Sequence, residues 1–214
     1  MSKYEEYAAQ REEVAYFMRR LYRQGLTTCS GGNLSLRVEP GLALVTPSAL
    51  DKGELKADQI GLFTMDGENL TPHLKGSIET GMHLEVLRRR QDISAVVHAH
   101  PVTATSFAAM NMDINTHLTS ESYAVIGRPV RAAYCIMGSE GLAKLVAEAL
   151  EGTDVALMQN HGVITVGKTM LNAFDKLEVL EAAAKMTWIT TTMRAATPMS
   201  TEQLGEIDTM FRAK

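Results

Sequence analysis

The sequence predicts an α/β protein, a three-layer α/β/α single domain with a central, mostly antiparallel sheet. Short apolar or alternating segments typical of strands recur along the 214 residues, separated by longer segments with helical spacing. The two kinds of segment do not alternate strictly, so a purely parallel sheet is not expected. No repeat, linker or low-complexity tract divides the chain, which favours a single domain over residues 1–214.

The first half of the chain is expected to begin with an amphipathic helix. Apolar residues recur at helical spacing over 4–24, and Gly25 then supplies a stop signal. Alternating segments on either side of a Pro-Gly turn predict a hairpin, and a further strand segment follows; the three lie at 33–38, 42–46 and 60–64. A helix over 78–90 should then lead into the strand that ends at His98.

The second half should add a hairpin and three helices. Helical patterns cover 103–110, a segment that begins at Ser139, and a long final segment over 170–194. The apolar runs 154–158 and 162–167 predict two paired strands. Residues 119–130 show no clear periodicity, so no element is predicted there.

Composition excludes several classes of partner. The formal net charge is -4, and no segment is rich in Lys or Arg, so nucleic acid is not expected to bind. No signal peptide or long apolar span indicates a membrane. The two cysteines, Cys29 and Cys135, lie far apart in the chain, and a reducing cytoplasm is the expected compartment.

Three histidines at the ends of apolar runs predict a metal site. His98 and His100 end one run, and side chains alternate along a strand, so both imidazoles should lie on one side. His161 ends a second run and can complete the set. Three neutral imidazoles with an open position suit a catalytic zinc ion, although Mn²⁺, Co²⁺ or Fe²⁺ can use the same ligands. The alternative is three ordinary surface or core histidines.

Several polar groups near these runs have two interpretations each. The segment Ser30-Gly-Gly-Asn33 has the composition of a phosphate-binding loop and equally that of a simple turn. Two further polar turns lie at 46–49 and 75–77. Glu79 is either a general acid/base or a carboxylate stabilised by a helix N-terminus. The remaining histidines are expected to be structural or exposed; they are His73, His83 and His117.

Five motifs occur in one order between residues 12 and 193: Ser30-Gly-Gly-Asn33, Thr46-Pro-Ser48, Ser77-Ile-Glu79, Val97-His-Ala-His100 and Asn160-His-Gly162. In this order and spacing the chain resembles the class II aldolase/adducin family, most closely its L-fuculose-1-phosphate aldolase branch. Five motifs in order are far more specific than any one of them. The resemblance implies the α/β/α fold and a homotetramer with active sites at subunit interfaces.

The resemblance also implies roles for individual residues. It implies zinc on His98, His100 and His161, and proton transfer by Glu79. The implied phosphate-binding residues are Ser30, Gly32, Asn33, Ser48, Ala49, Ser77 and Ile78. Ala49 and Ile78 stand where the family usually has glycine and serine. The family's tyrosine that reaches a neighbouring subunit's aldehyde is displaced here, and Tyr123 and Glu121 are the candidates for that role.

The implied function is a zinc-dependent retro-aldol reaction. A ketose 1-phosphate similar to fuculose 1-phosphate would be cleaved to dihydroxyacetone phosphate and an aldehyde. Other reactions on the same scaffold remain open, namely those of a pentulose-phosphate 4-epimerase, a methylthioribulose-phosphate dehydratase or a decarboxylase. A second alternative is a non-catalytic, adducin-like interaction module, but such modules lack the three-histidine set.

Overall fold

A computed structural model describes residues 3–211, so both ends of the predicted 1–214 domain, residues 1–2 and 212–214, lie outside the described residues. Its centre is a seven-stranded sheet with the strand order β3-β2-β1-β4-β7-β6-β5. The strands are β1 (Asn33–Glu39), β2 (Leu42–Val45), β3 (Gly61–Thr64), β4 (Ala95–Ala99), β5 (Val130–Ala132), β6 (Val155–Met158) and β7 (Gly162–Gly167). Neighbouring strands are antiparallel except β5 and β6, which confirms the predicted type of sheet.

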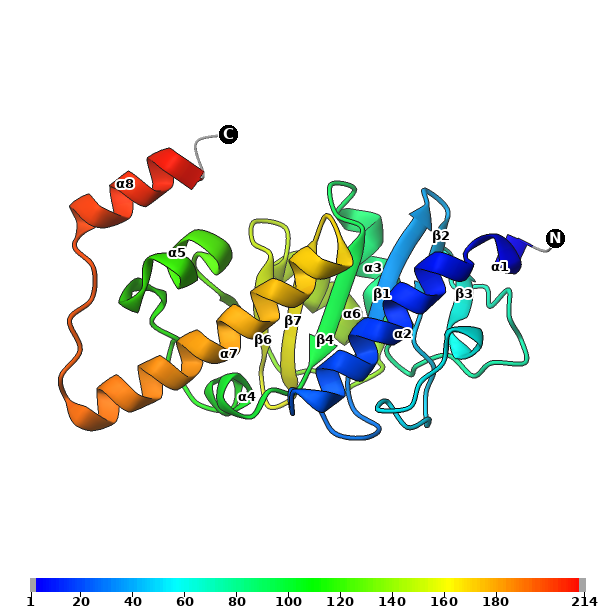
Figure 1. Ribbon diagram of the computed structural model, residues 1–214, viewed down its shortest axis with the longest axis horizontal. Helices are drawn as coiled ribbons and strands as arrows, with labels where there is room; N and C mark the ends of the chain where they lie inside the picture. The colour runs from blue at the N-terminus through cyan, green and yellow to red at the C-terminus, as the bar shows by residue number, and fades with distance from the viewer. Residues whose placement is uncertain (1–2, 212–214) are drawn as a thin grey trace.

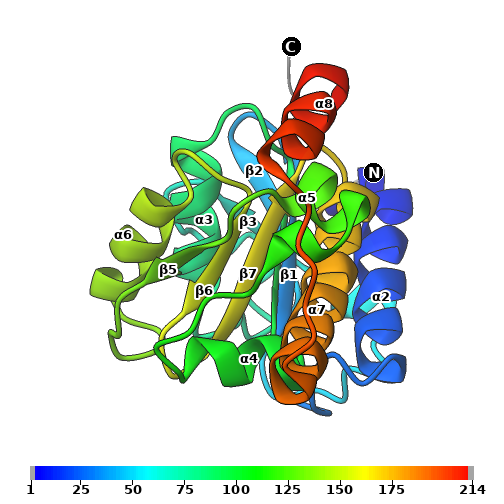
Figure 2. The same ribbon diagram turned by 90° about the vertical axis from the view of Figure 1, so that its left-hand side faces the viewer.

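Helices cover both faces of this sheet. They are α1 (Lys3–Glu6), α2 (Ala8–Arg23), α3 (Thr80–Arg89), α4 (Val102–Ala108), α5 (Ser120–Ile126), α6 (Glu140–Ala149), α7 (Met170–Met193) and α8 (Thr201–Phe211). Figures 1 and 2 show α2 and α7 on one face and α3 and α6 on the other. The predicted three layers are therefore confirmed. No helix of residues 3–211 is both long enough and apolar enough to cross a bilayer.

The alternation of side chains along the strands decides which face each functional residue occupies. Leu34 of β1 and Val97 of β4 pack in the core under α2 and α7. Val96 of β4 packs in the second core, with the apolar residues of α3 and α6. Because successive side chains point to opposite faces, Asn33 and His98 face the α3 side of the sheet. The β1–β4 register places these two residues directly opposite each other.

Three elements lie where the sequence pattern was uninformative. The unassigned segment 119–130 contains α5 and the first residue of β5, and α8 follows the predicted final helix. The helix α5 packs against α7 and α8 rather than on the sheet. Its side chains therefore meet other helices on more than one side, which explains the absence of a simple amphipathic period.

Candidate active site

The structure brings the three predicted histidines together where strand β4 ends and strand β7 begins. His98 lies near the end of β4, His100 follows that strand, and His161 immediately precedes β7. Because β4 and β7 are antiparallel neighbours, the end of one strand meets the start of the other. One ligand nitrogen from each ring lies within 4.8 Å of the other two. The Nε2 atoms of His98 and His100 are 3.1 Å apart.

The protonation state of these rings suits a cation. The Nδ1 atom of His98 lies 2.9 Å from the carbonyl oxygen of Val163, so it carries the proton and leaves the Nε2 lone pair directed at His100. Burial lowers the pKa of His98 to about 3, and burial also lowers the pKa of His100. His161 Nδ1 is buried and finds no hydrogen-bond partner within residues 3–211. Converging imidazole nitrogens are the donor set that divalent transition metals bind, so the three residues fit such an ion.

The Glu79 side chain contacts this histidine set and makes no contact that caps its own helix. Glu79 is the N-cap residue of α3, but its side chain makes no capping hydrogen bond. Its Oε1 lies 3.1 Å from His161 Nε2 and its Oε2 lies 3.4 Å from His98 Nε2. Asn33 Nδ2 donates to Oε2 at 2.7 Å. The carboxylate is therefore held in the site and does not act as a helix cap.

The charge of Glu79 follows from these contacts. Burial raises the pKa of the Glu79 carboxyl, but His161, His98 and the Asn33 amide together lower the pKa by more. The net result is a pKa well below the usual value for glutamate, so the group is ionised at neutral pH. An ionised carboxylate next to a cation-binding set can accept a proton from a bound molecule and return it.

The polar turns 46–49 and 75–77 are far apart in the sequence, but they pair with each other close to Asn33 and Glu79. Asn33 Nδ2 also lies 3.2 Å from Ser77 Oγ. The backbone N–H of Ser48 donates to the Lys75 carbonyl at 3.0 Å, which pairs the turn 46–49 with the turn 75–77. Because that N–H is already used, the Ser48 hydroxyl is the donor it can offer to a ligand. Gly32 has φ +67, and a Cβ there would lie 2.9 Å from the His98 carbonyl, so this position needs glycine.

The three remaining candidates for phosphate binding are exposed to solvent. Ser30 and Ala49 are exposed, and Ile78 is 59% exposed. Ala49 has φ +56, a left-handed conformation that costs a residue with a Cβ about 1 kcal/mol. Glycine would adopt this conformation without that cost.

The structure does not bring Tyr123 or Glu121 to the histidine set of the same chain. Both lie on α5. The Tyr123 hydroxyl donates to Asp208 of α8 at 2.9 Å, and its ring packs edge-on against His117. Within the described part of the chain, no hydrogen bond or ion pair joins either residue to the three histidines.

A cavity of about 340 Å³ opens beside the histidine set, and sequence reasoning missed most of its lining. His100 and His161 border it together with Asn160 and the segment 134–137. Within this segment Tyr134, Ile136 and Met137 are each about 60% exposed. The only signal in the sequence was the run of mostly large side chains at 134–137, after β5. Such a run has no periodic pattern that would mark it as part of a site.

Gly162 is predicted to be essential for the position of His100. A Cβ at Gly162 would lie 2.5 Å from His100 Cδ2 and 2.6 Å from the Ala99 carbonyl oxygen. Gly162→Ala should therefore displace the ring and weaken metal affinity roughly 10- to 100-fold, the usual effect of disturbing the surroundings of a ligand. Competition with a chelator measures this. Gly152→Ala is the control, because a Cβ there meets nothing within 4 Å, and equal affinities in the two variants would contradict the prediction.

Comparison with known proteins gives consistent results. Residues 12–188 match the family described as "Class II Aldolase and Adducin N-terminal domain". The chain is 33% identical over 177 residues to the L-fuculose phosphate aldolase of Methanococcus maripaludis, covering 83% of this chain and 95% of that relative. It is 30% identical over 182 residues to the 3-oxo-tetronate 4-phosphate decarboxylase of Haemophilus influenzae, covering 83% and 86% respectively. A solved L-fuculose 1-phosphate aldolase superposes with a TM-score of 0.87 at 29% identity, covering 94% of this chain and 95% of that one.

Proposed function

Because the chain belongs to the class II aldolase and adducin family, we propose that it cleaves a ketose 1-phosphate to dihydroxyacetone phosphate and an aldehyde. The observation that carries this proposal is the ionised carboxylate of Glu79 against three converging imidazoles, with Asn33 and Ser77 beside it. This arrangement offers a cation site, a proton acceptor and polar groups for a phosphorylated substrate.

The proposed metal ligands are His98, His100 and His161, and zinc is the proposed ion. A divalent ion on three imidazoles would supply a Lewis acid that stabilises negative charge on the ketone oxygen of the substrate. Zinc suits an all-nitrogen set with an open position, while Mn²⁺, Co²⁺ and Fe²⁺ are the other ions that such a set accepts.

Glu79 is the proposed proton-transfer group. In its ionised form Glu79 would accept the proton of the C4 hydroxyl as the C3–C4 bond of the ketose breaks. The C4 oxygen then becomes the carbonyl oxygen of the aldehyde, and the bonding electron pair stays with C3. C3 must then gain a proton to give dihydroxyacetone phosphate. Glu79 is buried and held through Asn33, so it can deliver that proton to one defined position.

The phosphate is proposed to bind the polar cluster that surrounds Asn33. Its members are Ser30, Gly32, Asn33, Ser48, Ala49, Ser77 and Ile78. The hydroxyls of Ser48 and Ser77 come from two turns that are paired with each other, and Gly32 allows the backbone to approach closely. These groups hold the substrate so that its C3 faces Glu79.

The aldehyde portion is proposed to occupy the cavity beside His100 and His161. Ile136 and Met137 line this cavity with apolar side chains, which favour an aldehyde that ends in a methyl group over one that ends in a hydroxyl. L-Fuculose is a 6-deoxy sugar, so its aldehyde fragment ends in a methyl group. This lining therefore supports a deoxy-ketose 1-phosphate as the substrate class.

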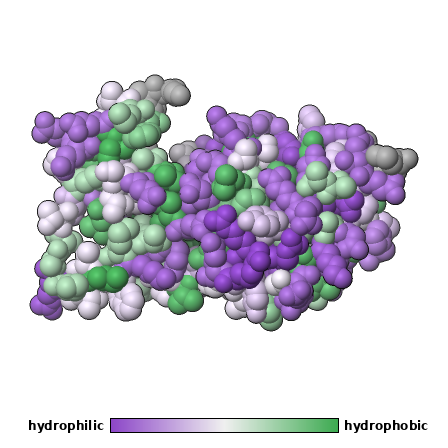
Figure 3. Space-filling view, viewed as in Figure 1, coloured by the Kyte–Doolittle hydropathy of each residue, from purple (hydrophilic) through white to green (hydrophobic). Residues whose placement is uncertain are grey.

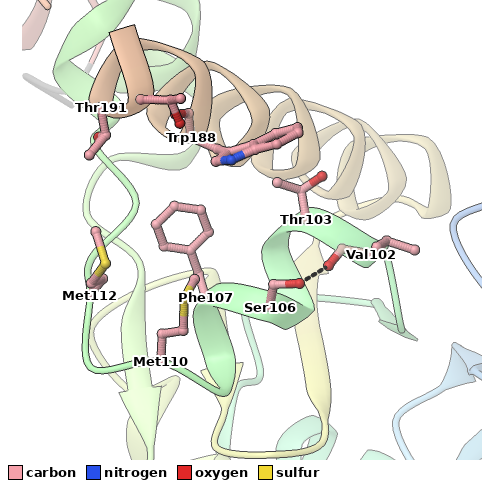
Figure 4. A pocket seen from close by; sticks show the side chains of 9 residues that line it. Val102, Thr103, Ser106, Phe107, Met110, Met112, Trp188 and Thr191 are labelled. Carbon is pink, nitrogen blue, oxygen red and sulfur yellow. Dashed lines mark hydrogen bonds between the residues drawn. The ribbon is translucent and has the colours of Figure 1, made fainter. Parts of the chain in front are cut away.

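A homotetramer is the proposed assembly, in which Tyr123 or Glu121 would reach the site of a neighbouring subunit. Apolar side chains gather over α5, α7 and α8 in Figure 3, whereas the surface over α2 is mostly hydrophilic. Figure 4 shows Trp188 of α7 facing Phe107 of α4 and Met110, which follows α4. These residues line an apolar cavity of about 470 Å³. Since α4 begins two residues after His100, a subunit docked on this surface would lie next to the proposed site.

Light scattering should therefore give a mass of about four subunits at working concentration. Trp188→Glu places a charge on an aromatic side chain that is 61% exposed, and this variant should shift the protein toward smaller species with reduced activity. Leu70 lies outside this surface and is 40% exposed, and Leu70→Glu should leave the mass unchanged. A monomer with full activity would rule out a site shared between subunits.

Product analysis tests the proposed reaction. The metal-loaded protein is incubated with L-fuculose 1-phosphate, and separately with dihydroxyacetone phosphate and a series of aldehydes. Two fragments, or a condensed ketose phosphate in reverse, are expected. A single isomer would indicate an epimerase, and loss of water or carbon dioxide would indicate a dehydratase or a decarboxylase. A protein that binds no metal and converts none of these compounds would be the adducin-like module.

The cytoplasm is the proposed compartment. Cys29 and Cys135 are both free thiols, and free thiols persist where disulfides are kept reduced.

A further inference from the structure

His83 is a buried histidine that the proposed chemistry does not use. It lies on α3 and is fully inaccessible to solvent. Its Nδ1 lies 2.8 Å from Ser35 Oγ, and its Nε2 lies 2.5 Å from Asn33 Oδ1. Asn33 in turn donates to Glu79. A chain of hydrogen bonds therefore runs from Ser35 through His83 and Asn33 to the proposed proton-transfer group.

The spacing of residues on β1 and α3 produces this chain. Asn33 and Ser35 are two apart on a strand, so they share a face and are separated by about 6.6 Å along it. Glu79 and His83 are four apart on a helix, so they also share a face and are separated by about 6 Å. The two separations nearly match. Asn33 can therefore contact Glu79 while Ser35 contacts His83.

The donor and acceptor atoms of Asn33 and Glu79 fix the direction of every hydrogen bond in this chain. Asn33 Nδ2 donates to Glu79 Oε2 and lies 3.2 Å from Ser77 Oγ, so the Asn33 NH₂ faces Glu79 and its Oδ1 faces His83. Oδ1 can only accept, so His83 Nε2 must carry a proton. Burial lowers the pKa of His83 to about 4 and so keeps the ring neutral, which leaves Nδ1 as an acceptor. Ser35 then donates its hydroxyl proton to Nδ1.

We propose that His83 is a positioning residue that locks the Asn33 side-chain amide in the one orientation in which its NH₂ faces Glu79. A rotated amide would place its NH₂ against the N–H of His83 and its oxygen against the carboxylate, so both contacts would be repulsive. Without His83, the two amide orientations have nearly the same shape, and only Ser77 and Glu79 remain to select between them. The consequence for catalysis rests on the proposed role of Glu79, whereas the direction of the hydrogen bonds does not.

The direction of the hydrogen bonds is tested by NMR on protein with ¹⁵N-labelled histidine. The His83 signals are assigned by their disappearance in His83→Gln. The expected result is a neutral ring with the proton on Nε2 and in slow exchange with water. A proton on Nδ1 would overturn the proposal, because Asn33 would then have to present its oxygen to Glu79. This measurement does not depend on aldolase activity, so it stays decisive if the proposed reaction is wrong.

The effect on Glu79 is tested with two substitutions at His83. His83→Leu removes the donor to Asn33, and we expect kcat to fall about tenfold while the metal content stays unchanged. His83→Gln places an amide donor near the position of Nε2 and should recover most of that loss. In an Asn33→Ala background, His83→Leu should have no further effect on kcat, because the group that it positions is already absent. Full kcat in His83→Leu, or additive losses in the double variant, would overturn the proposal.

Val86→Ala is the control for a general loosening of α3. Val86 lies on the same helix and is fully buried among apolar residues. It should lower the melting temperature without lowering kcat. An equal loss of kcat in Val86→Ala would overturn the proposal by assigning the effect to helix stability. If His83→Leu does not fold, Ser35→Ala replaces it, since that change lets the ring adopt the other tautomer and should also lower kcat.

Discussion

Glu79→Gln is expected to lower the rate of carbon–carbon cleavage by at least about 100-fold while leaving the fold and the metal content unchanged. Glutamine has nearly the shape of glutamate, and its side-chain oxygen can still accept the hydrogen bond from Asn33. It cannot take up or release a proton at neutral pH. A step that needs proton transfer should therefore fail, whereas packing around this buried residue should persist.

The sharpest readout is a half-reaction that needs no aldehyde. A base that acts on C3 of dihydroxyacetone phosphate exchanges one hydrogen with solvent, and NMR in deuterated water follows this exchange. The parent protein should exchange that hydrogen, and Glu79→Gln should not. A variant that exchanges at the parent rate would remove Glu79 from the mechanism and leave Tyr123 or Glu121 as the candidates.

Glu140→Gln is the matched control for this experiment. Glu140 is in the first turn of α6, so it has the helix-terminal position that was the alternative interpretation of Glu79. Its side chain is exposed and its ion-pair partner is Lys144, on the same helix. Glu140→Gln should leave both cleavage and exchange unchanged. The comparison separates a carboxylate that stabilises a helix from one that transfers a proton.

The elements with a clear period could be predicted from sequence because each buries one face. The spacing of apolar residues in α2 and α6 located these helices, and the apolar runs before His98 and His161 located β4 and β6. The His-x-His spacing of His98 and His100 follows from strand geometry alone, so their shared side was predictable as well. Their meeting with His161 depends on the pairing of β4 with β7, which local sequence does not specify.

The rest of the site depends on contacts between distant segments. Sequence left two interpretations of Glu79, because the direction of an N-cap side chain is set by its neighbours, here Asn33 of β1. His83 was expected to be structural or exposed, and its contact with Asn33 arises only when α3 packs on β1. The cavity-lining residues Ile136 and Met137 lie in a loop whose course no period predicts.

His100→Ala is expected to abolish metal binding and activity together. Each of the three imidazoles would supply one ligand nitrogen, and the parent protein should bind about one divalent ion per subunit through nitrogen alone. Removal of one ligand leaves two nitrogens, too few to retain zinc during dialysis. Loss of an electrostatic contribution of several kcal/mol corresponds to roughly a 1,000-fold or greater loss of rate. His100 follows β4 and is only half-buried, so the sheet should still fold.

Metal analysis after dialysis, alongside circular dichroism, tests this expectation without relying on a particular substrate. His73→Ala is the control, because His73 is exposed and outside the histidine set, and it should retain one ion per subunit. A folded His100→Ala protein with full metal content would contradict the assignment of the ligands. Parent protein without metal that still cleaves the substrate would contradict the metal-dependent reaction itself. Loss of metal from His100→Ala alone, with an intact fold, would connect the His98-x-His100 spacing in the sequence directly to the chemistry of the site.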